Sequence, residues 1–294
     1  MNTSVITTEG RVYAGVFGCI MVIGLPLNAV ALWILLRRHS LKSPHAVLMV
    51  NLAVSDLLVI ISLPMRIYFH ATGRWPLSNM MCQFITMLFR INIRSSTFFI
   101  TFISVDRLLA VVYPLRSRHL RTSSNAWKGA AVVWLFVLLM NVPEFMKLKY
   151  FKNRNNTTCF GPLDSVSATQ SAVIYLYMAL IVTMLAVNII CTVMVSWTLC
   201  NRPSDTAKIN NKVNVMLIFA MNLVLFTICF LPVHIRLATK SFTHVTPLAC
   251  LAAVNCCLDP LLYYFSFDSF WKKKEDATNG GEILGSGRDR EKTC

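Results

Sequence analysis

Three arginines stand inside long apolar segments, where a positive charge is expensive to place. Arg90 and Arg94 interrupt the segment that runs from Cys82 to Pro114, and their spacing of four residues puts them on one face of a helix. Arg66 stands in the preceding apolar segment. A guanidinium group facing lipid is costly, so we expect these side chains to line a water-filled cavity. Their forked donors suit a phosphate or a carboxylate; the alternative is that one or more of them extends outward to the membrane surface.

Other basic residues are expected to strengthen the positive field around this cavity. Lys147 and Lys149 follow the fourth apolar segment, and Arg236 ends the sixth. The predicted anion-binding set is therefore Arg66, Arg90, Arg94, Lys147, Lys149 and Arg236.

A second group of polar residues lies in the middle of the apolar segments and consists of acids, amides and a hydroxyl. Oxygen ligands of this kind suit a sodium ion or a water cluster. A structural hydrogen-bond network without an ion is an equally good interpretation. The predicted polar core is Asn28, Asp56, Asn92, Ser96, Asn255 and Asp259, with Asp56, Ser96 and Asp259 as the sodium ligands if an ion binds.

An acid–base pair, Asp106 and Arg107, ends the same segment that carries Arg90 and Arg94. One interpretation is a charge pair at the membrane boundary. The other is a latch that keeps the inner face closed until a ligand shifts the conformational equilibrium.

The segments that must position these residues are those of a membrane protein. The chain has 294 residues, of which 55% are hydrophobic and 14% charged, whereas soluble domains carry roughly 25% charged residues. Seven apolar blocks of about 20 residues or more can be counted, each long enough for a spanning helix. We therefore predict an all-α membrane protein, a seven-transmembrane helix bundle. The blocks cover residues 12–36, 46–69, 80–113, 126–146, 171–199, 213–237 and 247–267.

Basic residues follow the first, third, fifth and seventh blocks, which predicts that those gaps are cytoplasmic and the N-terminus extracellular. Their placement also argues against reading the net charge of +15 as a nucleic-acid surface. The predicted organisation is an extracellular N-terminus (1–11), the bundle (12–267) and a cytoplasmic tail (268–294) that begins with a short amphipathic helix on the membrane surface. Glycosylation sequons at Asn2, Asn155 and Asn156 fall on the predicted outer side.

Cys82 and Cys159 also fall on this outer, oxidising side, where a disulfide between them is expected. The alternative is two free thiols. The cysteines inside the apolar blocks are read as buried small hydrophobic residues.

The motifs, taken in order, resemble those of rhodopsin-like (class A) G-protein-coupled receptors over nearly the whole chain. Phe230 and Asp259, where most relatives have tryptophan and asparagine, are typical of the purinergic-like branch. Within that branch several stretches resemble the lysophosphatidic acid receptors. The motifs that carry the resemblance are Asn28, Leu52-Ala53-Val54-Ser55-Asp56, Asp106-Arg107-Leu108, Trp134, Cys229-Phe230-Leu231-Pro232 and Asp259-Pro260-Leu261-Leu262-Tyr263.

The resemblance implies roles for individual residues. Arg107 would contact a heterotrimeric G protein, Phe230 would act as a switch above which the ligand binds, and Tyr263 would repack on activation. Pro232 belongs to the same switch segment. The implied ligand is an anionic lipid such as lysophosphatidic acid, and the implied location is the plasma membrane. Two departures stand out: block five lacks the proline usual near Met184, and the short distance between blocks six and seven means either a very tight outer turn or a missing segment.

Several function classes remain in view at this point. The first is a receptor for an anionic lipid that activates G proteins, and the alternatives within the branch are a receptor for a nucleotide or small carboxylic acid and a decoy that binds without signalling. A transporter or channel for organic anions is disfavoured because no internal repeat is present. No nucleophile–base pair or metal motif supports an enzyme, and sodium is the one cofactor considered.

Overall fold

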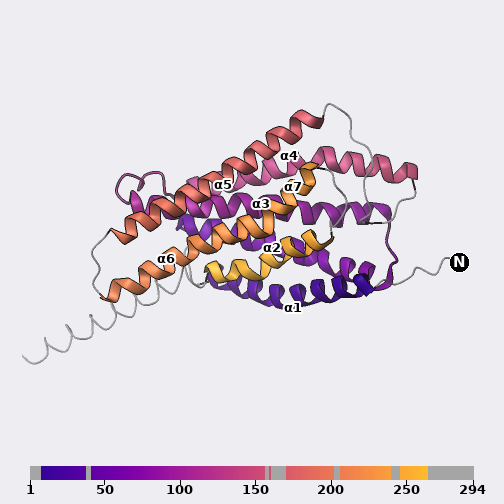
Figure 1. Ribbon diagram of the computed structural model, residues 1–294, viewed down its shortest axis with the longest axis horizontal. Coiled ribbons are helices and arrows are strands. Elements are labelled where there is room, and N and C mark those ends of the chain that lie inside the picture. Colours follow the sequence, from indigo (N-terminus) through magenta and orange to yellow (C-terminus); the bar gives the residue numbers. More distant parts are fainter. Residues whose placement is uncertain are drawn as a thin grey trace, which may run out of the picture.

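A computed structural model describes residues 8–37, 41–155, 159, 170–201, 206–239 and 246–263. These ranges contain helices and turns and no strand. Seven of the helices are long and apolar enough to cross a membrane, and they pack side by side in an elongated bundle (Figure 1). The predicted seven-helix membrane architecture is confirmed.

The first five spans are single helices, and the sixth combines three helical elements. The helices are α1 (Thr8–Arg37), α2 (Pro44–Thr72), α3 (Asn79–Val112), α4 (Ser123–Asn155), α5 (Gln170–Cys200), α6 (Thr206–Val224), the π-helix η1 (Leu225–Phe230) and α7 (Leu231–Thr239). The last helix, Thr246–Tyr263, is the unlabelled yellow helix of Figure 1, and we call it the C-terminal span.

Most helix ends lie within a few residues of the expected ones, and local sequence explains why. Proline at the first position of α2 has no N–H to leave unpaired. The helix ends at Gly73, whose φ of 65° is left-handed and suits glycine. At the start of α3, Ser78 Oγ accepts a hydrogen bond from the Met81 N–H at 3.3 Å. The main difference is α4, which continues to Asn155, beyond the predicted end of its apolar block at Met146.

Helix α3 is the centre of the bundle. It packs against α2, α4, α5, α6 and η1. On the other side of α2, helix α1 comes close to the C-terminal span at Gly24, where an added Cβ would lie 3.1 Å from the Cys256 sulfur. Glycine at this position therefore allows the close approach.

The distribution of apolar side chains is that of a protein surrounded by lipid. Large residues fill the interior, among them Phe99 and Phe230 at 0% exposure. Equally apolar residues cover the outside, and Trp197 and Leu139 are 72% and 60% exposed. Such a surface is suited to hydrocarbon and would be a liability in water.

We call the end of the bundle that carries Cys82 the outer end and the end that carries Arg107 the inner end. Both lie on α3, so the two names are fixed by one helix.

Candidate functional site

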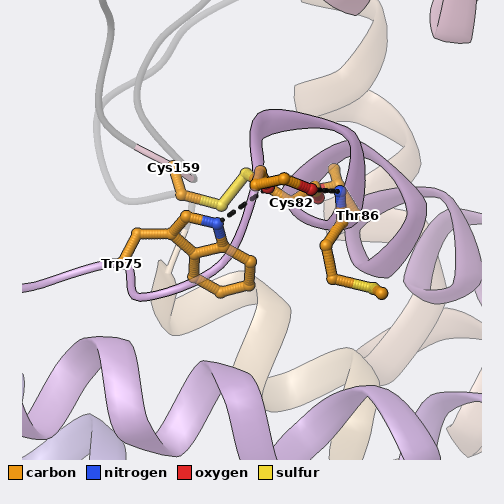
Figure 2. The surroundings of a disulfide bond; sticks show 6 residues. Trp75, Cys82, Thr86 and Cys159 are labelled. Atoms are coloured by element: carbon orange, nitrogen blue, oxygen red, sulfur yellow. Dashed lines mark hydrogen bonds between the residues drawn. A yellow bond between two sulfur atoms is a disulfide. The ribbon is translucent and has the colours of Figure 1, made fainter.

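A disulfide closes the outer end of the bundle. Cys82, near the start of α3, is bonded to Cys159, which follows α4, and their Cα atoms are 6.0 Å apart (Figure 2). Trp75 lies beside the bridge, and its indole N–H donates to the Ser78 carbonyl at 3.1 Å (Figure 2). The expected pairing is confirmed, and it anchors the segment after α4 to the central helix.

Arg66 and Arg90 lie near each other below this closure. Arg66, on α2, is only 6% exposed, and its guanidinium carbon lies 4.2 Å above the centre of the Phe89 ring. Such a contact is a cation–π interaction. Arg90 is half-buried and is the main charged neighbour of Arg66. Two positive charges are thus held close together by α2 and α3, which favours an anion between or beside them.

Arg94 is engaged by the neighbouring helices α4 and α5. Its Nη1–H donates to Asn141 Oδ1 at 2.6 Å, and its guanidinium carbon lies 5.5 Å from the centre of the Tyr177 ring. Both Arg94 and Asn141 are 4% exposed. Arg94 lies one turn after Arg90 along α3. Arg90 neighbours Arg66 on α2, whereas Arg94 contacts residues of α4 and α5.

His234 continues this network to α7. Tyr177 Oη lies 2.5 Å from His234 Nδ1, and His234 Nε2 lies 3.0 Å from Thr97 Oγ1. The Thr97 hydroxyl donates its one proton to the Ile93 carbonyl at 2.7 Å, so it must accept from the histidine. The arrangement therefore assigns the proton to Nε2 and makes Nδ1 the acceptor of the tyrosine hydrogen bond.

This chain of contacts joins four spans through polar groups that are buried or, at Tyr177, half-buried. Asn141 on α4, Arg94 and Thr97 on α3, Tyr177 on α5 and His234 on α7 follow one another without a break. We call these five residues the outer network. A change at Arg94 is thereby coupled to α7, whose His234 ring also lies 6.5 Å from the Phe230 ring.

The remaining members of the predicted anion-binding set are elsewhere. Arg236 lies at the outer end of α7, beside a groove formed with the C-terminal span. Lys147 and Lys149 belong to the part of α4 whose side chains are outside the described set.

Members of the predicted polar core lie deeper in the bundle in two hydrogen-bonded groups, one around Asn92 and one formed by Asn255 and Asp259. Asn92 Nδ2 is central to the first group, because it lies 3.2 Å from Asp56 Oδ1, 3.2 Å from Ser96 Oγ and 2.9 Å from the Ser55 carbonyl. Asn255 Nδ2 donates to Asp259 Oδ2 at 2.5 Å. The Asn92 contacts thus link α2 to α3, and the Asn255–Asp259 bond lies within the C-terminal span.

The two carboxyl groups of this core are fully buried. Asp56 and Asp259 are each 0% exposed, and each is a charged neighbour of the other. Two neighbouring carboxylates in an apolar interior repel each other, so the pair favours a proton on one of them or a cation beside both. Asp56 Oδ2, Asp259 Oδ1 and Asn255 Oδ1 have no hydrogen-bond donor among the described residues. These oxygens fit a small hard cation, and Asp56, Ser96 and Asp259 would hold it.

The other members of the core and of the switch are also buried. Asn28 Nδ2 donates to the Cys256 carbonyl at 2.5 Å, which ties α1 to the C-terminal span. Phe230 ends η1, Pro232 follows it in α7, and Tyr263 is 4% exposed. All three are therefore placed in or beside the packed interior.

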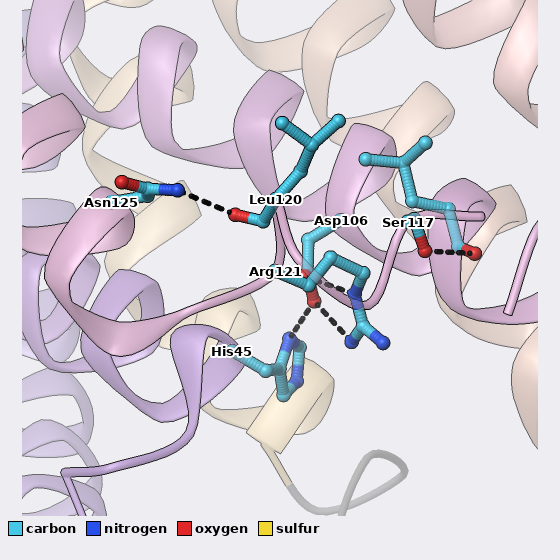
Figure 3. Close-up of polar contacts among 7 residues, drawn as sticks. His45, Asp106, Ser117, Leu120, Arg121 and Asn125 are labelled. Atoms are coloured by element: carbon cyan, nitrogen blue, oxygen red, sulfur yellow. Dashed lines mark hydrogen bonds and ion pairs between the residues drawn. The ribbon is translucent and has the colours of Figure 1, made fainter. Parts of the chain in front are cut away.

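The inner end differs from the expected latch between sequence neighbours. Asp106 Oδ1 accepts from Arg121 Nε at 2.8 Å and Oδ2 from Arg121 Nη2 at 3.3 Å, and His45 Nδ1 lies 3.6 Å from the same Oδ2 (Figure 3). The Arg107 Nε is buried and has no acceptor among the described residues. Asp106 thus joins α3 to α2 and to the loop after α3, and Arg107 is left outside that pairing.

Four further expectations concern residues outside the described ranges. These are the sequons at Asn2 and Asn156, the tight outer turn over residues 240–245, and the tail with its amphipathic helix. Asn155 is the last residue of α4, and its side chain is not among those described.

The family model for 7 transmembrane receptors (rhodopsin family) matches residues 27–263. The chain belongs to this family, and it is a multi-pass membrane receptor of that class.

Its relatives include several lysophosphatidic acid receptors. It is 32% identical to lysophosphatidic acid receptor 6 of Mus musculus, over 93% of this chain and 88% of that receptor. It is 34% identical to receptor 4 of Homo sapiens, over 90% and 75% of the two chains. With receptor 5 of Bos taurus the identity is 35%, over 87% and 76%. The three subtypes therefore match about equally well.

Several residues of these sites were not foreseen from the sequence. Asn141, Tyr177, Thr97 and His234 complete the outer network, and Arg121 holds Asp106. The available signal was modest: Asn141 and His234 are polar residues inside apolar blocks, which is itself a marker of function in membranes.

Proposed function

We propose that this receptor detects an extracellular anionic lipid of the lysophosphatidate kind and activates heterotrimeric G proteins. The observation that carries the proposal is the pair Arg66 and Arg90, two cations held close together inside an apolar bundle near its outer end. The names of the three relatives support the lipid class. The proposal includes a plasma-membrane location with the N-terminus outside, as the basic gaps predict.

The arginines supply the recognition chemistry. A phosphate or carboxylate accepts charge-assisted hydrogen bonds from a guanidinium group, and these are shorter and stronger than bonds to a neutral amide. Asn141 offers Arg94 such a neutral acceptor. A lipid head group that reached Arg94 would therefore compete well with Asn141, by about 1 kcal/mol per bond.

The outer network supplies the coupling. Once Arg94 turns toward the head group, its contacts with Asn141 and Tyr177 change, and Tyr177 holds His234 on α7. His234 lies beside Phe230 at the end of η1, where the sixth span changes its helical winding. The ligand would thus favour a different arrangement of the sixth span, and the populations shift only by the difference in its affinity for the two states.

The polar core and the inner ion pair would set the resting state. A sodium ion held by Asp56, Ser96 and Asp259 would offset the charge of one carboxylate, and a proton on the other carboxyl group would leave the site neutral. At the inner end, Arg121 keeps Asp106 paired, and Arg107 would meet the G protein when the inner face opens.

The test is ligand-dependent nucleotide exchange on purified G protein, with the receptor in lipid nanodiscs. The panel is oleoyl lysophosphatidate, its neutral counterpart monooleoylglycerol, a nucleoside diphosphate and a small carboxylic acid. The proposal requires exchange driven by the lysophosphatidate and not by the neutral lipid. Exchange driven only by the nucleotide or the carboxylic acid would mean that the receptor detects that class of ligand and not a lipid. Binding without exchange would identify a decoy receptor.

A further inference from the structure

A groove of about 350 Å³ separates α7 from the start of the C-terminal span at the outer end. Volumes of this size are typical of small-molecule sites, roughly 300–1,000 Å³. Five of the six lining residues are apolar, and two are prolines, whose compact rings leave space between the helices. The lining residues are Leu231, Pro232, Ile235, Arg236, Pro247 and Leu248.

The groove is exposed on the outside of the bundle and not enclosed within it. Ile235 is 41% exposed, and Pro247 is exposed as well. Pro232, Ile235 and Arg236 share one helix face, while Val233 and His234, at 7% and 0% exposure, point into the interior. Because exposed apolar faces of a membrane-spanning bundle contact hydrocarbon, the natural occupant of this groove is an acyl chain.

Arg236 restricts the occupant further. It is half-buried, lies at the end of its span and makes no hydrogen bond or ion pair with another described residue. A guanidinium group at this depth prefers a phosphate or carboxylate, which it can hold with two parallel hydrogen bonds. An anionic lipid with one hydrocarbon chain satisfies both halves of the site, whereas a neutral lipid leaves the cation without a counter-ion.

We propose that this groove is a bilayer-facing binding site for a lysophosphatidate-like lipid, with the chain in the groove and the head group on Arg236. This inference rests on the proposed function for the identity of the lipid. The lipid would enter the groove laterally from the outer leaflet, between α7 and the C-terminal span. His234 is on the opposite face of α7, so a lipid that displaces α7 from the groove side would also move this member of the outer network.

The site is tested by photo-crosslinking on the full receptor in nanodiscs. The probe is an oleoyl lysophosphatidate with a photoreactive group at the chain end, and the labelled peptides are read by mass spectrometry. We expect labelling within residues 231–248. The variant Ile235→Trp fills the groove and should reduce this labelling at least tenfold. The matched control, Ile228→Trp, adds the same bulk at a residue of the same span that is 52% exposed and outside the groove, and should leave labelling unchanged.

Head-group recognition is tested with Arg236→Gln and Arg236→Lys. Glutamine should lower labelling by the anionic probe about tenfold and leave a monooleoylglycerol probe unaffected, while lysine keeps most of it. Labelling elsewhere, labelling that Ile235→Trp does not reduce, or equal labelling by the two probes would overturn the groove site. These readouts are independent of signalling. A receptor that labels as expected but drives no nucleotide exchange contradicts the proposed function and leaves the groove site standing.

Discussion

Arg121 donates two hydrogen bonds to Asp106, fifteen residues before it in the chain, and so occupies the carboxylate next to Arg107. Asp106 is 7% exposed and Arg121 25% exposed, so the pair lies between a buried and a surface ion pair. We expect Arg121→Ala to raise basal nucleotide exchange about five- to thirtyfold, because losing about 1–2 kcal/mol from the closed state shifts the equilibrium by that factor. The increase is measured as the rate of nucleotide exchange on purified G protein without ligand. Arg118→Ala, an exposed arginine of the same loop, is the control, and equal basal rates in both variants would contradict the role.

Arg90→Ala should reduce the potency of oleoyl lysophosphatidate about ten- to a hundredfold. The reason is the loss of one charge-assisted contact with the head group, worth about 1.5–3 kcal/mol. Arg90 is half-buried, so surface expression should stay near that of the parent. Dose–response curves of nucleotide exchange provide the measurement, with the exposed Arg74→Ala as the control. Unchanged potency in Arg90→Ala would remove this arginine from the ligand site.

His234→Phe should destabilise the receptor and weaken its response. Phenylalanine keeps the ring but makes neither of the two side-chain hydrogen bonds, and each is worth about 1 kcal/mol. Tyr177→Phe removes only one of them, so its effect should be about half as large. Thermal unfolding of the purified receptor without ligand gives the comparison. Equal melting temperatures for His234→Phe and the parent would show that these bonds do not hold the outer end together.

Removing the disulfide should cost stability and ligand binding together. The bridge joins residues 77 positions apart, and native bridges of small domains are worth about 2–5 kcal/mol. The double variant Cys82→Ser with Cys159→Ser should therefore show lower surface expression and weaker lysophosphatidate binding. Cys19→Ser, at an exposed free cysteine, is the matched control. Normal binding by the double variant would mean that the closure of the outer end is dispensable.

Sodium should weaken agonist binding if the polar core holds a cation. In the parent receptor, replacing choline chloride by sodium chloride at equal ionic strength should lower agonist affinity several-fold, because the ion stabilises the resting state. Asp56→Asn removes a buried oxygen charge and should abolish the difference. Radioligand displacement in the two salts is the measurement. A parent receptor indifferent to the choice of salt would leave the core as a hydrogen-bond network without an ion.

The seven spans and the Cys82–Cys159 bridge could be predicted from the sequence, because length, hydropathy and the placement of basic residues decide them. The partners of Arg94 and Asp106 could not. Which side chains meet across helices depends on how each helix is rotated about its axis, and hydropathy does not fix that angle to within one residue. Asn141 and Arg121 are separated from their partners by 47 and 15 positions, so no local pattern announces either contact.

The extension of α4 beyond Met146 was missed for a similar reason. Proline and the following basic residues are typical of a helix end, yet a proline-containing helix continues when neighbouring groups satisfy its backbone. Likewise, no residue of Leu225–Phe230 distinguishes a π-turn from an α-turn in the sequence.

The π-helical turn η1 gives the sixth span a way to rotate about its own axis. Here the Leu231 N–H reaches back to the carbonyl of Phe226, so one residue more than in an α-turn is wound into the sixth span. If this turn changed to α-helical winding, the extra residue would be taken up by the neighbouring helix. The part of the sixth span on one side of the turn would then rotate by about 100° around the helix axis relative to the other part. His234 and Arg236 lie just beyond the turn, so such a rotation would move His234 out of its interior position and change the groups that Arg236 faces.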